Sequence, residues 1–170
     1  MKSIVITLAI GFGLGLSPVA SGTFGTLLGL PLVYFLFGKL DLPVSLQIVA
    51  PVVMALLAIP IPDVAEKQFK KKDDGRIVVD EYLTFPICVI GLPVLNPVML
   101  GTAFVVNRVF DIIKPPPARG LHRFTGGLGI TIDDVFSSLY ALAVNWGLYL
   151  WVLKPQGWLL SWSQLLDLIR

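Results

Sequence analysis

The chain has few of the residues on which disulfide-linked, zinc-binding and soluble proteins depend. Of its 170 residues, one is cysteine, one is histidine and 14% are charged. A single cysteine excludes a disulfide framework and a thiolate metal cluster. Soluble domains are about one quarter charged, whereas 55% hydrophobic residues and a mean hydropathy of +0.82 are typical of a membrane protein. The net charge of +2 is too small to suggest a nucleic-acid partner.

Four stretches contain neither charged residues nor histidine: 3–38, 42–62, 82–107 and 135–153. A helix needs about 20 mostly apolar residues to cross a bilayer, so the second and fourth stretches each predict one crossing. In the first stretch we expect 24–38 to span the bilayer. The Gly/Ser/Pro-rich part before it should be irregular backbone, which must be buried in protein or lie at the interface.

The third stretch, 82–107, is interrupted by Pro86, by Gly91 and Pro93, and by Asn96 followed by proline. These breaks predict either one kinked crossing or a hairpin that enters the membrane and returns.

Two loops, 63–81 and 108–134, hold nine of the 13 basic and nine of the 11 acidic residues. Basic loops tend to stay cytoplasmic, so we expect both loops to face the cytoplasm. The segment between them must then cross an even number of times, which favours the hairpin. We therefore predict an all-α, polytopic integral membrane protein, with one domain over 1–170 and a re-entrant or broken segment at 82–107.

Five acids stand at the polar ends of apolar segments: Asp80, Glu81, Asp111, Asp133 and Asp134. One such acid usually reaches water and ends a helix. Five of them at three segment ends on the same side predict a cluster, and clustered carboxylates need a cation. Hard oxygen ligands suit Mg²⁺.

Four basic residues accompany these acids in one short loop: Arg108, Lys114, Arg119 and Arg123. Such a loop could anchor anionic lipids, or it could bind phosphate oxygens. The lysine run 70–72 is more typical of a solvated interfacial face.

Two Gly/Thr-rich segments, 21–26 and 125–129, are predicted to be turns that present N–H groups or the Thr23 hydroxyl to an anion. A simple N-cap role for Thr23 is the alternative. The lone His122 beside Arg123 is more typical of an interface than of a catalytic site.

Several phosphatase chemistries are excluded. Position 94 is valine, so Cys88 has no arginine six residues later. There is no D-x-D-x-[TV] motif and no second histidine. Hydrolysis by this chain would have to use carboxylates and metal.

Together these motifs resemble the phosphatidylglycerophosphatase A family. The matching pieces lie in the family's order and cover about a third of the chain: "GFGLGLSPVASGTFGTLLGLPL" (11–32), "IVVDE" (77–81), "NRVFDIIKPPPAR" (107–119) and "GGLGITIDDV" (126–135). Ser21 and Thr84 stand where the family often has proline and glycine.

The resemblance implies a Mg²⁺-dependent phosphoric monoester hydrolase that converts phosphatidylglycerophosphate to phosphatidylglycerol, in phosphatidylglycerol and cardiolipin biosynthesis. It places the enzyme in the bacterial inner membrane, with the site at the cytoplasmic face. The expected catalytic residues are Asp80, Glu81, Asp133 and Asp134, and Asp111 joins them as a metal ligand. Thr23, Arg108 and Lys114 are the expected phosphate-binding residues.

Two other functions compete with this hypothesis. A CDP-alcohol phosphatidyltransferase requires D-G-x2-A-R-x8-G-x3-D-x3-D, which the chain lacks. A divalent-cation binder or transporter would place carboxylates within the spans rather than at one edge. The expected partners are the lipid substrate and the bilayer, and nothing in the sequence sets an oligomeric state.

Overall fold

The computed structural model describes residues 2–72, 74–121 and 126–169 of the chain. Across these ranges the elements are helical and no strand occurs, so the all-α prediction is confirmed. The elements in chain order are α1 (Lys2–Ala9), η1 (Gly11–Leu16), α2 (Ser21–Leu27), α3 (Gly29–Val33), η2 (Tyr34–Lys39), α4 (Val44–Ala58), α5 (Pro60–Phe69), α6 (Val79–Thr84), η3 (Phe85–Val89), α7 (Pro97–Ile113), α8 (Ala118–Leu121), α9 (Gly127–Leu148), η4 (Tyr149–Leu153) and α10 (Trp162–Ile169).

Three helical segments in the described ranges are long and apolar enough to cross a membrane: Ser21–Lys39, Val44–Phe69 and Gly127–Leu153. The second segment leaves Val52, Leu56 and Leu57 between 53% and 62% exposed. Such an apolar surface is costly in water but suits contact with lipid chains.

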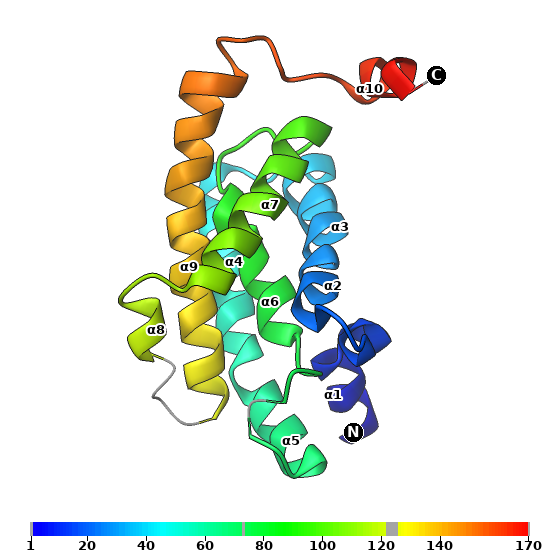
Figure 1. Cartoon of the computed structure of the whole chain (residues 1–170), viewed down its shortest axis with the longest axis vertical. Coiled ribbons are helices and arrows are strands. Elements are labelled where there is room, and N and C mark those ends of the chain that lie inside the picture. Colours follow the sequence, from blue (N-terminus) through cyan, green and yellow to red (C-terminus); the bar gives the residue numbers. More distant parts are fainter. Residues whose placement is uncertain (1, 73, 122–125, 170) are drawn as a thin grey trace.

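Residues 82–107 form a hairpin, as predicted. The α6–η3 arm ascends through the bundle, the chain turns at 90–96, and α7 descends beside it (Figure 1). The two ends of the hairpin meet again, because Arg108 on α7 pairs with Glu81 on α6. The charged segments on either side of the hairpin therefore lie at the same end of the molecule.

Polar side chains from neighbouring helices satisfy the broken part of this hairpin. Asn145 Nδ2 donates to the Cys88 carbonyl at 2.9 Å, and Trp146 Nε1 donates to the Ile90 carbonyl at 3.1 Å. Gln47 Oε1 accepts from the backbone N–H of Gly91 at 2.8 Å. Backbone groups inside a membrane need such partners, which explains why apolar helices retain these amides and an indole.

The larger core surrounds η3, against which α3, α7 and α9 pack. Its buried members are Val33, Phe37, Phe85, Cys88, Val89, Leu92, Val94, Met99, Leu100, Ala103, Ala141 and Leu153. This packing fixes α6, α7 and α9 relative to one another, and these helices carry the five acids.

The N-terminal segment is only partly irregular. Residues 2–9 contain no glycine and form the helix α1, and the first glycine of the chain is Gly11. Helix α1 packs against α5. After α1 the backbone has positive φ at Gly11, Phe12 and Gly13, which ends the helix. The prediction of irregular backbone is therefore wrong for 3–9 and for 21–23, which begin α2, and correct for 10–20, where η1 contains non-helical backbone at Phe12 and Gly13.

Candidate functional site

A cavity of about 150 Å³ is lined by residues from α2, α6, α7 and α9 and from the segments next to them. Figure 1 shows where the lower ends of these helices lie in the molecule. All five acids singled out in the sequence line it, together with Lys114; the full lining is Ser21, Gly75, Ile77, Asp80, Glu81, Asp111, Lys114, Ile130, Asp133 and Asp134. We call this space the acidic cavity.

The acids come from three elements far apart in sequence. Asp80 and Glu81 are in the first turn of α6, Asp111 is in the last turn of α7, and Asp133 and Asp134 are in the second turn of α9. Asp80 and Asp134 are each 5% exposed and Asp133 is fully buried. Carboxylates buried to this extent need protons or cations nearby.

Arg108 compensates part of this charge behind the cavity. Its Nη1 pairs with Glu81 Oε2, lies 2.8 Å from Asp111 Oδ2, and donates to Thr26 Oγ1 at 3.0 Å. The Thr26 hydroxyl is itself 2.7 Å from Glu81 Oε2. Arg108 thereby ties α7 to α6 and α2. It is not among the residues that line the acidic cavity.

Lys114 compensates charge inside the cavity. Its Nζ is 2.5 Å from Asp133 Oδ2, 3.6 Å from Asp134 Oδ1 and 3.8 Å from Asp111 Oδ1. Burial opposes the charged ammonium, but the carboxylates of Asp134, Asp133 and Asp111 outweigh it and raise the pKa of Lys114. Lys114 ends α7 with φ 45°, a conformation uncommon for a residue other than glycine.

Asp80 and Asp134 lie within hydrogen-bonding range of each other. Two carboxyl groups in such contact must share a proton or have a cation between them. Asp80 Oδ1 is buried and has no hydrogen-bond partner within the described ranges. No three Asp, Glu, His or Cys side chains of the described residues are already arranged around an ion position.

Glycines allow the helices to approach closely around the site. A Cβ on Gly22 would overlap the carboxylate of Glu81 and lie 3.1 Å from Arg108 Nη2. A Cβ on Gly127 would overlap the Ile59 carbonyl, and the Gly127 N–H donates to Asp63 Oδ1 at 2.7 Å. These two positions set the distances of α2 from α6 and of α9 from the α4–α5 junction.

A smaller polar layer adjoins the acidic cavity, because the two share three lining residues. Glu81, Asp111 and Asp134 reach it, and the other lining residues are Thr84, Asn107, Ser137 and Ser138. The Ser138 hydroxyl donates to Asn107 Oδ1 at 3.1 Å. The acids therefore have hydroxyl and amide groups as neighbours within the bundle.

The prediction that 21–26 form a turn, with Thr23 facing an anion, differs from the structure. This segment is the helix α2 rather than a turn, and Thr23 does not line the acidic cavity. Ser21 lines it instead, while Thr26 contacts Glu81. Gly22 and Thr26 are four residues apart and so share one face of a helix, and this spacing is the sequence feature that could have predicted the helix and the contact of Thr26.

Two residues noted in the sequence, and part of one predicted turn, are not described by the structure. His122 and Arg123 lie outside the described residues, as does the first residue of 125–129. Gly126 has φ 73° and is a turn residue, but 127–129 are the start of α9, so the prediction of a turn is wrong for these three residues.

A family model and two relatives carry the same name. The model of the phosphatidylglycerophosphatase A family matches residues 7–149. A protein of Haemophilus influenzae named phosphatidylglycerophosphatase A is 35% identical over 147 residues, which is 86% of this chain and 89% of the relative. One of Escherichia coli with the same name is 32% identical over 148 residues, which is 83% and 84%.

A third relative, from Bacteroides thetaiotaomicron, is named a putative phosphatidylinositol-3-phosphatase. It is 31% identical over 141 residues, which is 80% of this chain and 87% of the relative. No solved structure matches this chain.

Proposed function

The chain belongs to the phosphatidylglycerophosphatase A family, and we propose that it hydrolyses phosphatidylglycerophosphate to phosphatidylglycerol and inorganic phosphate. The observation that carries the proposal is the acidic cavity, in which five carboxylates and one lysine from three helices meet at one end of an apolar bundle. A site in this position can receive the headgroup of a lipid whose acyl chains stay in the bilayer.

The cation on the cavity wall supports phosphate binding. Lys114 Nζ already binds carboxylate oxygens there, so it can donate in the same way to the oxygens of a phosphoryl group. Charge that develops on those oxygens in the transition state would be stabilised by this ammonium. Arg108 acts one layer behind, where it holds Glu81 and Asp111 in place.

The carboxyl pair of Asp80 and Asp134 supports proton transfer. We assign it, as a pair, to accept the proton of the water that attacks phosphorus. The oxygen of the water forms the new bond to phosphorus as the bond to the glycerol oxygen breaks. The glycerol oxygen takes up this proton from the carboxyl pair and leaves as the hydroxyl of phosphatidylglycerol.

The carboxylate oxygens that line the cavity are ligands that Mg²⁺ prefers. Asp80 Oδ1, which has no hydrogen-bond partner among the described residues, is one such ligand atom. The residues that would hold the ion are Asp80 and Asp134, with Glu81, Asp111 and Asp133 around them. Bound there, Mg²⁺ would polarise phosphoryl oxygens and lower the pKa of a water. Lys114 would have to turn away from the carboxylates that the ion needs.

Phosphate release from phosphatidylglycerophosphate in detergent micelles tests this function. We expect turnover with Mg²⁺ and none after EDTA, with recovery when Mg²⁺ is returned in excess. Absence of turnover at every Mg²⁺ concentration would refute the proposal. Cation flux into proteoliposomes without hydrolysis would favour the transporter hypothesis instead.

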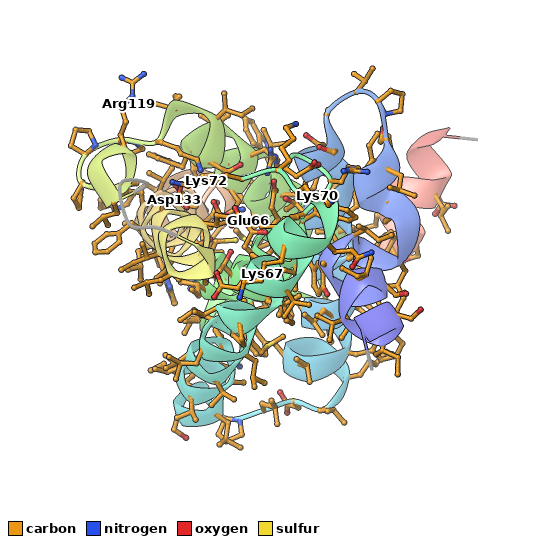
Figure 2. All side chains as sticks on the ribbon, turned by 90° about the horizontal axis from the view of Figure 1, so that it is seen from below. Glu66, Lys67, Lys70, Lys72, Arg119 and Asp133 are labelled. Atoms are coloured by element: carbon orange, nitrogen blue, oxygen red, sulfur yellow. The ribbon has the colours of Figure 1, made fainter. Side chains whose placement is uncertain are left out.

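We further propose that the enzyme lies in the bacterial inner membrane, with the acidic cavity on the cytoplasmic side, and that it serves phosphatidylglycerol and cardiolipin synthesis. The underside of the bundle carries Lys67, Lys70, Lys72 and Arg119 (Figure 2), and basic segments favour the cytoplasmic side. Cysteine introduced at Lys70 should react with impermeant maleimide only when the reagent is added on the cytoplasmic side. The native Cys88 is fully buried and should give no background reaction.

A further inference from the structure

A second hollow adjoins the acidic cavity on its outer side. It has a volume of about 310 Å³ and is lined by Ile112, Ile113, Lys114 and Arg119. We call it the Arg119 groove. Lys114 lines both spaces, with its ammonium among the carboxylates of the acidic cavity. A ligand that filled both spaces would therefore pass along the Lys114 side chain.

The walls of the Arg119 groove combine a cation with apolar surface. Arg119 is exposed, and no acid in the described ranges pairs with it. Figure 2 shows its side chain projecting outward from the body of the molecule. Ile112 and Ile113 are 73% and 59% exposed. An unpaired guanidinium beside two exposed isoleucines matches a phosphate next to acyl esters.

The proposed substrate has two phosphates of different kinds. Its terminal phosphate is a monoester and is the group removed, while its inner phosphate is a diester that joins glycerol to the acylated glycerol. The acidic cavity accounts for the first. The acidic cavity holds one lysine among five carboxylates, so a cation outside it is the better partner for the second phosphate.

We infer that the Arg119 groove binds the phosphodiester of the lipid, with Arg119 as its cation and the two isoleucines against the acyl-glycerol region; this inference rests on the proposed function. The planar guanidinium donates two hydrogen bonds to a phosphate. The enzyme thereby selects lipids that carry both a phosphodiester and a phosphomonoester. Phosphatidic acid, which has the monoester alone, would leave the groove's cation unused.

The test compares Arg119→Gln with the wild type on phosphatidylglycerophosphate and on phosphatidic acid in the same mixed micelles. A hydrogen-bonded charge pair at an exposed position changes affinity by only a few-fold. We therefore expect KM for phosphatidylglycerophosphate to rise about 3- to 5-fold, with kcat within about 1.5-fold. Kinetics on phosphatidic acid should not change. Arg119→Lys should recover part of the loss.

Lys70→Gln is the matched control, because it removes one exposed positive charge from the same face without touching the groove (Figure 2). An unchanged KM in Arg119→Gln, an equal loss on both lipids, or an equal effect of Lys70→Gln would overturn the inference and leave the proposed function intact.

A wild-type protein that hydrolyses neither lipid would overturn the proposed function. The inference is then decided by equilibrium binding of the two lipids to the solubilised protein. A preference of the wild type for the two-phosphate lipid that Arg119→Gln abolishes would support it, and equal binding by the two proteins would reject it.

Discussion

Replacing Asp80 with asparagine separates what the acidic cavity does for turnover from what it does for stability. The side chain is 5% exposed, its Oδ1 has no hydrogen-bond partner within the described ranges, and its carboxyl group contacts that of Asp134. Asparagine has nearly the same shape, so the change removes a charge and a metal ligand without opening a void.

We expect turnover of Asp80→Asn to fall at least about 100-fold, equivalent to about 2.7 kcal/mol of transition-state stabilisation. Stability should move in the opposite direction. The new amide can donate to Asp134, and one hydrogen bond is worth about 1 kcal/mol. For a chain of this length that corresponds to a rise in Tm of about 3 °C. Functional sites often trade stability for activity in this way.

The assay measures phosphate release with saturating Mg²⁺ and thermal unfolding by tryptophan fluorescence, on the same detergent preparation. Asp74→Asn is the control, because Asp74 is also a buried carboxylate but lies outside the cavity lining and is paired with Arg76 at 2.8 Å. It should lose stability and keep turnover within a few-fold. Normal turnover in Asp80→Asn, or a Tm several degrees below wild type, would refute the reasoning.

Two further outcomes are expected. Gly22→Ala places a methyl group against the carboxylate of Glu81, so it should destabilise the protein by about 1–3 kcal/mol and lower kcat at least about 10-fold. Gly101→Ala is the control, because the space around its Cβ position is open, and it should be neutral or stabilising. Equal losses of stability and kcat in the two variants would contradict this prediction. The hydrogen bond from Arg76 lowers the pKa of Asp74 to about 2 from 3.8, so the contribution of Asp74 to stability is complete above pH 4 and lost as pH falls towards 2. The Tm of the wild type should therefore drop more than that of Asp74→Asn over this interval. Parallel plots of Tm against pH for the two proteins would show that the Asp74–Arg76 pair contributes nothing.

Much of the architecture follows from where the chain keeps and omits charge. Long uncharged stretches indicated the membrane segments, and Pro86, Gly91 and Pro93 indicated the break that becomes a hairpin. The sequence also indicated that Asp80, Glu81, Asp111, Asp133 and Asp134 would gather, because buried carboxylates at one edge stabilise one another only through shared cations.

Helix phase and packing decided the rest. Residues 21–26 form a helix, so Ser21 reaches the cavity and Thr23 does not, although both have hydroxyl groups. Arg108 and Lys114 look equivalent in sequence, yet one lies behind the acids and the other among them. That difference depends on the angle at which α7 crosses α6 and α9. Close packing through Gly22 and Gly127 sets the neighbouring distances, and no local pattern of residues encodes them.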